Sequence, residues 1–306
     1  MKRVIVSGAT GLIGSSLVQE LLQKGYYVLA LARQGSEKLI RLPEHKNLEI
    51  IELDIKDIKL LPEKTDKKFD TFFHLAWEGL RAASRDAREL QNQNYLATMG
   101  ALEAAYAFDC KTFIGAGSQA EYGSFEGPVD EISCTQPVTE YGKYKLRAAQ
   151  EANLKAQEYG MRFIWTRVFS VYGEYDFGDS LIMTCVRKML NNENVPLSQC
   201  IQEWDFLYAK DAAQAFMFLD ETAAAKGIYN VASGICKTLK EFVLEMKQIT
   251  GSKSELMFGQ IPYGPKGFVS FHPVVDKLKR DTKWQHATDF NMGIENIIKF
   301  IKDSKK

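Results

Sequence analysis

The chain lacks the features that mark several specialised classes of protein. It has no net charge, because 39 lysines and arginines balance 39 aspartates and glutamates. Without an excess of one sign, no overall field attracts it to nucleic acid or to an anionic membrane. No apolar run approaches the ~20 residues that cross a membrane, and glycines interrupt the apolar start before a signal peptide is complete. These absences favour an ordinary globular protein with a sizeable core.

Cysteine and histidine are also scarce. The 306 residues include 5 cysteines, widely spaced and without a CxxC pair, and 4 histidines without the spacing of metal ligands. Disulfide frameworks and zinc sites need such pairs. We therefore expect reduced, mostly buried thiols, no metal site and a cytoplasmic protein. A chain of this length forms one large domain or two modest ones.

Glycine is concentrated near the start, in the stretch VSGATGLIGSSL. Its three glycines, Gly8, Gly11 and Gly14, follow a β-branched run at 3–7 and open a segment with apolar residues at helical spacing. A second apolar run follows at 26–32. In such a strand–turn–helix–strand unit, glycines permit close backbone approach, and the helix N-terminus offers N–H groups to a pyrophosphate. The position of these glycines predicts a dinucleotide-binding site.

Strands and helices continue to alternate along the first half of the chain. This alternation predicts a parallel sheet with helices on both faces, that is, a Rossmann-type doubly wound α/β fold. The alternation ends after Gly173. We therefore predict a dinucleotide-binding domain at 1–173, joined by about 205–233, and a smaller mixed α/β substrate-binding domain at 174–306. The expected strands are 3–7, 26–32, 48–55, 69–77, 111–118, 162–173 and 227–233, and further helices are expected at 84–108, 139–159 and 205–219.

A candidate catalytic pair lies in the stretch EYGKYK. Tyr141 and Lys145 are four residues apart on a predicted helix, so they share a face. A phenol with a pKa of about 10 is ionised on the order of 0.1% of the time at neutral pH, and an ammonium beside it favours the phenolate. Such a tyrosine can exchange a proton with a sugar hydroxyl. The hydroxyl of Ser118, at the end of an expected strand, could bond the same oxygen.

The tip of the second strand bears on the choice of cofactor. NAD-binding units place a carboxylate there to bond the ribose 2′-hydroxyl. Here Arg33 occupies that place, and a cation suits a 2′-phosphate. We therefore expect NADP, with NAD as the alternative. Asp54, after the third strand, would either bond the adenine edge or cap a turn.

Taken together, these motifs give the chain a resemblance to a known family. It is similar to the extended short-chain dehydrogenase/reductases of the epimerase/dehydratase type, which act on nucleotide-activated sugars, from Val4 to about Ile301. The matching pieces are GATGLIG (8–14), LDIKD (53–57), HLAW (74–77), the asparagine of NYLATMGALEAA, GSQAEYG (117–123), YGKYK (141–145), RVFSVYG (167–173), DFLYAKDAAQA (205–215) and YNVASG (229–234).

The resemblance implies roles for individual residues. Ser118, Tyr141 and Lys145 would be the catalytic set, and Lys145 would also hold the nicotinamide ribose. The implied partner is a small-molecule nucleotide sugar, with no nucleic acid or membrane. The residues implied to bind the cofactor are Gly8, Thr10, Gly11, Leu12, Ile13, Gly14, Arg33, Asp54, Ile55, Leu75, Ala76, Trp77, Asn94, Tyr141, Lys145 and Val168.

Three departures from the family pattern narrow the expected activity. Gln119 and Ala120 stand where the dehydratases carry an acidic pair, so α-proton chemistry lacks its acid and base. Trp204 replaces the usual arginine that holds a substrate phosphate, and Ser170 replaces the usual asparagine. The strand-two tip and the DFLYAKD segment resemble 4-ketoreductases that make deoxysugar nucleotides.

Three functions therefore compete. The first is an NADP-dependent reductase of a 4-keto nucleotide sugar, with Tyr141 as proton donor. The second is a 4-epimerase with tightly bound NAD, and the third is a dinucleotide sensor without activity, which has no need of the catalytic set. The resemblance also suggests a homodimer formed through two long helices. Leu96, Met99, Leu102 and Leu146 would serve either the core or that interface.

Overall fold

A seven-stranded sheet forms the centre of the molecule. The computed structural model describes all residues except 81–83, 125–126, 177–178, 264–268 and 305–306. The strand order is β11-β7-β5-β4-β1-β2-β3, and every neighbouring pair is parallel. This order confirms the predicted doubly wound fold. The strands are β1 (Arg3–Ser7), β2 (Tyr27–Ala32), β3 (Leu48–Glu52), β4 (Thr71–His74), β5 (Thr112–Ser118), β7 (Arg162–Val168) and β11 (Gly227–Val231).

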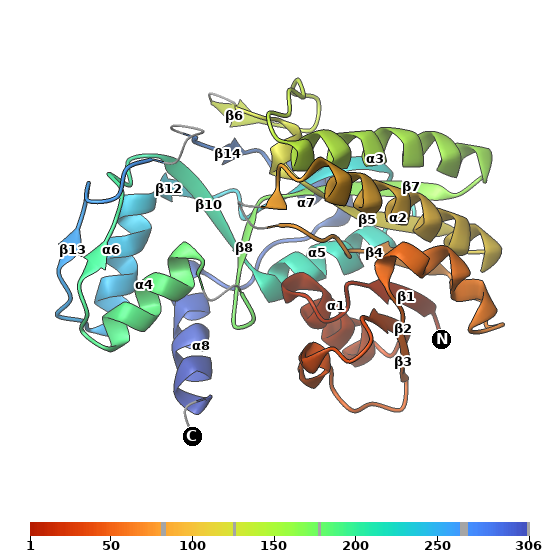
Figure 1. The fold of residues 1–306 in the computed structure, drawn as a ribbon, viewed down its shortest axis with the longest axis horizontal. Helices are drawn as coiled ribbons and strands as arrows, with labels where there is room; N and C mark the ends of the chain where they lie inside the picture. Colours follow the sequence, from red (N-terminus) through yellow and green to blue (C-terminus); the bar gives the residue numbers. More distant parts are fainter. Residues whose placement is uncertain (81–83, 125–126, 177–178, 264–268, 305–306) are drawn as a thin grey trace.

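Helices cover both faces of this sheet (Figure 1). Alternate side chains of each strand point to opposite faces, so Val4 joins one hydrophobic core while Ile5 joins the other. The core around Val4 packs against α1 and α5, and the core around Ile5 packs against α2 and α3. These helices are α1 (Leu12–Gln23), α2 (Arg88–Ala107), α3 (Glu140–Glu158) and α5 (Ala209–Glu221).

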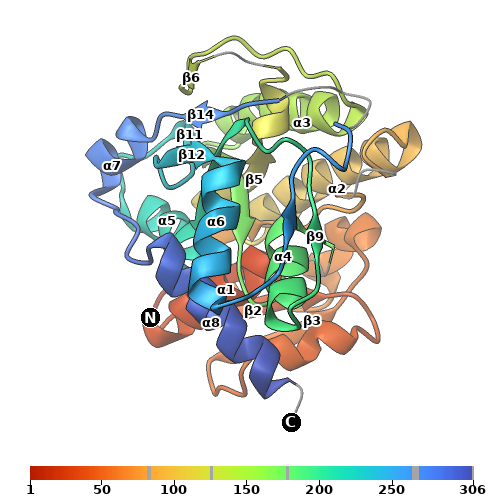
Figure 2. The same ribbon diagram turned by 90° about the vertical axis from the view of Figure 1, so that its left-hand side faces the viewer.

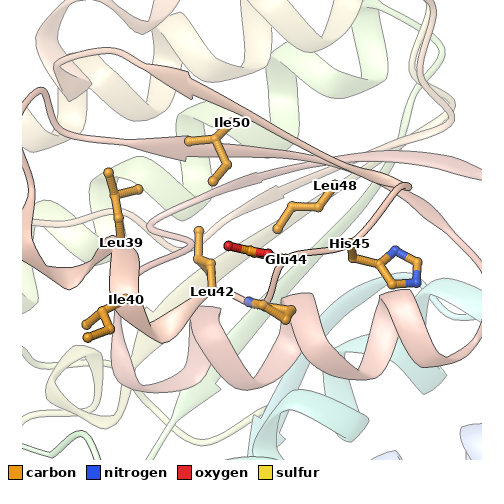
Figure 3. A pocket seen from close by; sticks show the side chains of 8 residues that line it. Leu39, Ile40, Leu42, Glu44, His45, Leu48 and Ile50 are labelled. Atoms are coloured by element: carbon orange, nitrogen blue, oxygen red, sulfur yellow. The ribbon is translucent and has the colours of Figure 1, made fainter.

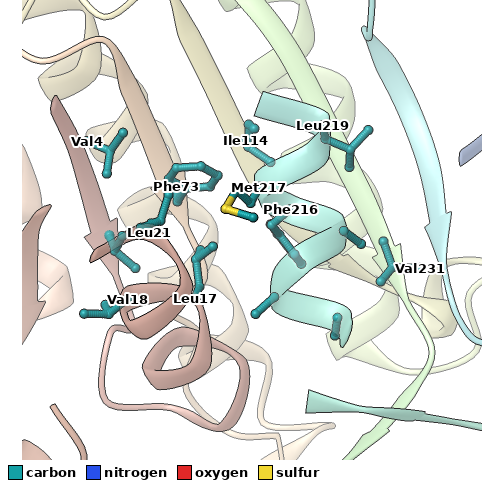
Figure 4. Packing of buried hydrophobic residues seen from close by; sticks show 14 of the residues in the cluster. Val4, Leu17, Val18, Leu21, Phe73, Ile114, Phe216, Met217, Leu219 and Val231 are labelled. Carbon is teal, nitrogen blue, oxygen red and sulfur yellow. The ribbon is translucent and has the colours of Figure 1, made fainter. Parts of the chain in front are cut away.

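The core beneath α1 and α5 joins segments that are far apart in the sequence. Figure 4 shows Leu17 and Leu21 of α1 and Phe216 of α5 directed toward Phe73 on the sheet. Trp284 is also part of this core, and no part of it is exposed. A segment beyond the predicted 205–233 range therefore also packs into the core of the main sheet. The division into two domains stays a prediction.

A smaller lobe lies beside the sheet in Figure 1 and faces the viewer in Figure 2. Its three-stranded sheet has the order β12-β10-β8, and its own core includes Met183, Phe242 and Ile294 from three helices. The remaining elements are β6 (Pro128–Val129), β8 (Ser170–Tyr172), β9 (Val195–Pro196), β10 (Glu203–Tyr208), β12 (Cys236–Thr238), β13 (Leu256–Met257), β14 (His272–Pro273), α4 (Leu181–Leu190), α6 (Leu239–Thr250), α7 (Asp276–Thr282), α8 (Phe290–Asp303) and the 3-10 turns η1 (Glu37–Arg41), η2 (Ile55–Glu63) and η4 (Gln119–Glu121).

Two predicted elements need correction. The expected strand at 162–173 is two strands in different sheets, because Phe169 bonds Val231 of β11 while the next residues pair with β10. The expected helix at 205–219 begins only at Ala209, since its first residues belong to β10. Apolar residues continue along both runs without a turn signal, so the hydrophobic pattern does not reveal where one element ends and the next begins. The other expected elements are correct to within a few residues at their ends.

Candidate active site

The glycine turn after β1 is packed closely on itself and on the end of β4. Gly8 has a positive φ of 73°, and a Cβ there would lie 2.7 Å from Ala76 N. A Cβ on Gly14 would lie 2.0 Å from the carbonyl oxygen of Gly8. Any side chain at either position would therefore displace backbone. Gly11 differs, because a Cβ there would meet only Gly8 O, at 3.2 Å.

The open side of this turn is the N-terminus of α1. Gly11 is the N-cap of the helix, and no side chain caps its first N–H groups. Thr10 lies in the turn, and Leu12 and Ile13 are the first two residues of α1. Free N–H groups and the positive end of the helix dipole together suit an anion. The residues present therefore fit the pyrophosphate of a dinucleotide.

The turn after β4 is held from α2. Asn94 Oδ1 accepts the N–H of Glu78 at 2.8 Å, and Asn94 Nδ2 donates to the carbonyl of Glu78 at 2.9 Å. The indole N–H of Trp77 donates to Gln91 at 2.8 Å. Leu75 is bonded to the end of β1, since its N–H donates to Ser7 O at 3.1 Å. Asn94 thus acts on the backbone that would face the cofactor.

His74, at the end of β4, is neutral. Its Nε2 lies 3.1 Å from Thr98 Oγ1, whose own proton goes to Asn94 O at 3.0 Å. Nε2 must therefore carry the imidazole proton, and Nδ1 accepts the hydroxyl of Ser7 at 2.9 Å. Burial lowers the pKa of His74 to about 3. Both ring nitrogens are therefore hydrogen-bonded within the protein, and this histidine has a structural role.

Ser118 and Tyr141 come together at the carboxyl end of β5. Ser118 is the N-cap of η4, where its Oγ accepts the N–H of Ala120 at 3.2 Å. Tyr141 is the second residue of α3, whose N-cap is Thr139. Burial raises the pKa of Tyr141, although contact with the Ser118 hydroxyl lowers it. The predicted neighbours Ser118 and Tyr141 are thus in contact, and burial favours the neutral form of the phenol.

Lys145 lies on the buried side of α3 together with Tyr141, but its ammonium is closer to another aromatic ring. Its Nζ donates to Ala116 O and lies 3.7 Å from the centroid of the Trp77 ring, but 6.0 Å from that of Tyr141. Burial lowers the pKa of the Lys145 ammonium, and Glu121 opposes this only in part. The expectation that Lys145 lowers the pKa of Tyr141 stays a prediction. A tryptophan from another element is the closer aromatic partner of the lysine.

A buried carboxylate stabilises the carboxyl end of β5. Glu121 is fully buried, and it accepts the N–H of Ser118 at 2.8 Å and the indole N–H of Trp165 at 2.9 Å. Its other oxygen accepts Arg167 Nε at 3.0 Å. A Cβ on Gly117 would lie 2.2 Å from the Trp165 nitrogen. The sequence analysis did not identify Glu121. The alternating glycines of β5 were a signal, because they leave room for the large side chain of Trp165 on the neighbouring strand β7.

The tip of β2 carries an ion pair. Arg33 Nη1 lies 3.0 Å from Glu78 Oε1, and both side chains are partly exposed. Asp54 caps η2, because its carboxylate accepts the N–H of Lys56 at 3.0 Å. Of its two predicted roles, turn capping is therefore present. Ile55 begins η2.

Trp204 and Ser170, the two departures from the family pattern in the smaller lobe's sheet, are hydrogen-bonded to each other. Trp204 Nε1 donates to Ser170 Oγ at 2.7 Å, and the indole ring packs edge-on against Phe271. Val168 ends β7 just before them. The positions where the family has an arginine and an asparagine thus form one neutral unit.

Other kinds of site receive no support from the described residues. Within them, no helix is both long and apolar enough to cross a bilayer, and His, Cys, Asp and Glu form no cluster suited to a metal. The five cysteines are free thiols. Figure 3 shows a hollow beside β3, lined by Leu39, Leu42 and Leu48 among others. Its lining includes none of the predicted catalytic or cofactor-binding residues.

The fold and the site define an α/β dinucleotide-binding enzyme with serine, tyrosine and lysine at the carboxyl end of its sheet. Residues 4–232 match the profile of the NAD dependent epimerase/dehydratase family, and the chain belongs to this family. The predicted fold class and the prediction of an enzyme are thereby confirmed.

Three similar proteins illustrate the range of the family. CDP-abequose synthase from Salmonella muenchen is 25% identical over 300 residues, which cover 97% of each chain. The dTDP-6-deoxy-L-talose 4-dehydrogenase (NAD(+)) from Aggregatibacter actinomycetemcomitans is 31% identical over 259 residues, covering 79% of this chain and 88% of the relative. The structure of MoeE5 in complex with UDP-glucuronic acid and NAD matches with a TM-score of 0.85 and 26% identity, covering 99% of both chains.

Proposed function

We propose that the protein reduces the 4-keto group of a nucleotide-activated sugar, with Tyr141 as the proton donor. The observation that carries this proposal is the buried phenol of Tyr141 in contact with the Ser118 hydroxyl. A ketone reductase needs a proton donor beside the carbonyl oxygen, and a phenol that keeps its proton at neutral pH supplies one. A 4-epimerase is the alternative, but it must first withdraw a proton from a hydroxyl.

The remaining groups would orient the reacting oxygen. Ser118 Oγ accepts the N–H of Ala120, so its own proton is available to donate to the oxygen at C4. Tyr141 Oη would transfer its proton to the same oxygen. Glu121 fixes the backbone of Ser118 through the N–H that it accepts. A sensor would have no need of this arrangement.

The glycine turn and the end of β4 would hold the dinucleotide. We assign the pyrophosphate to the turn at Gly8, Gly11 and Gly14, and the nicotinamide ribose to Lys145. When bound, the nicotinamide supplies the hydride of the reduction. Family members named above as NAD enzymes support a nicotinamide dinucleotide in general.

Arg33 supports the finer choice of NADP over NAD. Its ion pair with Glu78 is partly exposed, and such pairs contribute about 0–1 kcal/mol. A charge-assisted contact with a 2′-phosphate contributes roughly 1.5–3 kcal/mol, so a phosphate would displace the carboxylate. We therefore retain NADP as the proposed cofactor.

Replacing Arg33 tests this choice. Arg33→Ala should weaken NADPH binding by about one to two powers of ten and leave NADH almost unchanged. Glu78→Gln is the matched control, because it frees the guanidinium and should not weaken NADPH. Fluorescence titrations of both cofactors give the answer. A wild-type preference for NADH, or equal weakening of both cofactors, would contradict the assignment and favour the epimerase.

The relatives support a nucleotide sugar as substrate. The name of the talose relative places oxidoreduction at C4 of a dTDP-sugar. Trp204 and Ser170 form a neutral pair, so we propose that a cation elsewhere in the smaller lobe compensates the substrate's diphosphate charge. We also propose the domain division at 1–173 and 174–306, and a cytoplasmic location, which free thiols suit.

Two measurements separate the candidate functions. The dinucleotide retained by the purified protein is extracted and identified, and reduction is assayed with NADPH and 4-keto sugars linked to dTDP, CDP or UDP. An empty protein that consumes NADPH supports the reductase. Retained NAD with interconversion of C4 epimers supports the epimerase, and bound dinucleotide without any turnover supports the sensor.

The two long helices offer a surface for a homodimer. Leu96 on α2 and Leu154 on α3 are 55% and 61% exposed, while Leu102 is fully buried and belongs to the core. We propose that this exposed apolar surface pairs with a second copy. Leu96→Glu should convert a dimer to a monomer in sedimentation equilibrium, whereas Ile40→Glu, exposed far from these helices in the sequence, should not. A monomeric wild type contradicts the proposal.

A further inference from the structure

An arginine that precedes α2 lies against the proposed proton donor. The guanidinium carbon of Arg85 is 4.8 Å from the centroid of the Tyr141 ring. Its Nε is buried without a hydrogen-bond partner, and in the described part of the chain no carboxylate lies within ion-pair distance of it. Among the described residues, no carboxylate therefore forms an ion pair with its positive charge. Sequence reasoning did not single this residue out.

The backbone around Arg85 is fixed to the start of α3. The N–H of Tyr141 donates to Arg85 O at 2.8 Å, and the N–H of Glu140 donates to the Asp86 carboxylate at 3.1 Å. On the other side, Gln91 donates to Ser84 O at 2.9 Å. These bonds hold the segment between α2 and α3. The arginine is thus placed relative to Tyr141 by main-chain contacts as well as by its own side chain.

Lys145, the other cation of the site, is engaged elsewhere. Its ammonium donates to Ala116 and lies over Trp77. Burial makes Lys145 lose its proton more readily than an ordinary lysine. A guanidinium, in contrast, stays charged at all accessible pH values. Of the two cations, Arg85 is the one whose charge persists beside Tyr141.

We propose that Arg85 is a positioning cation that stabilises the phenolate form of Tyr141. This deepens the proposed function, on which it rests for the role of Tyr141 as proton donor. When the Oη–H bond breaks, the proton goes to the sugar oxygen and the negative charge stays on the phenolate, which Arg85 faces. Among the described residues, the other charged groups facing Tyr141 are Glu121 from η4, which opposes ionisation, and Lys145 from its own helix.

The titration of residue 141 tests this proposal without substrate. 3,5-Difluorotyrosine, whose phenol is more acidic than that of tyrosine, is incorporated at position 141 and followed by fluorine NMR against pH. An opposite charge at this distance lowers a pKa by about 1–3 units, so Arg85→Met should raise the midpoint by about one pH unit or more. Arg85→Lys keeps a charge and should raise it less. Lys145→Met should shift it less than Arg85→Met.

A matched arginine serves as the control. The guanidinium of Arg147 on α3 is partly exposed and lies 4.1 Å from the ring centroid of Tyr95 on α2. Arg147→Met should leave the midpoint unchanged. The proposal is overturned if Arg85→Met has the wild-type midpoint, if Lys145→Met shifts it further, or if Arg147→Met shifts it equally. Should Arg85→Met fail to fold, Arg85→Gln replaces it under the same criteria. If Arg85→Met raises the midpoint as expected but the wild-type protein reduces none of the 4-keto sugars, the role of Arg85 is supported and the proposed function is rejected.

Discussion

Tyr141→Phe should lower the turnover of 4-keto sugar reduction by a factor of ~10² or more, the range expected for loss of a general acid. The change removes only the hydroxyl. The ring keeps its edge-on contact with Trp77 and its place beneath Arg85, so the fold should persist. Turnover is measured with NADPH, and circular dichroism and thermal unfolding monitor the fold.

Tyr144 provides the control for this experiment. It lies on the same helix and packs against Tyr95, away from Ser118. Tyr144→Phe removes an equivalent hydroxyl and should retain turnover close to that of the wild type. A Tyr141→Phe protein that also retains it would mean that another group donates the proton.

Gly11→Val should abolish detectable dinucleotide binding while leaving the fold intact. The φ of Gly11 is −75°, which valine adopts, and a Cβ there has only one close neighbour. The branched side chain would then fill the space before the N-terminus of α1, where the pyrophosphate is expected. Calorimetric titration with NADPH and NADH measures the loss, and circular dichroism checks the fold.

A second substitution at the same position separates binding from stability. Gly11→Ser places a capping hydroxyl at the N-cap of α1, so it should preserve or raise thermal stability while weakening the dinucleotide. Gly14→Ala would be less informative, because a Cβ there lies 2.0 Å from backbone and would disturb the turn itself. Unchanged affinity in Gly11→Val would show that this glycine serves only the turn.

The features that could be predicted from the sequence are those that depend on neighbouring residues. The glycine turn, the alternation of strands and helices, and the cap at Asp54 are all encoded within short segments. The break at Phe169 could not be predicted, because an apolar extended run looks the same in one sheet as in two. Its position is fixed by a bond to Val231, far along the chain.

The contacts within the candidate active site were also not predictable from local sequence patterns. Helical spacing correctly placed Tyr141 and Lys145 on α3, but it could not reveal that Trp77 lies against the lysine. Nor could it reveal that Arg85 covers the tyrosine ring. Each of these contacts joins elements distant in sequence, so local periodicity contains no information about them. The charge balance of the site is therefore a property of the tertiary structure.

The burial of Trp284 in the core beneath α1 and α5 has a consequence for the synthesis of the chain. Its indole N–H donates to Asp211 O at 3.2 Å, and Leu278 lies in the same core. A nascent chain that has emerged only as far as β11 contains every strand of the main sheet but lacks these two side chains. Its α5 surface stays open to water or to chaperones until the segment that carries Leu278 and Trp284 has also left the ribosome. Completion of this core therefore waits for residues that are translated well after the last strand of the main sheet.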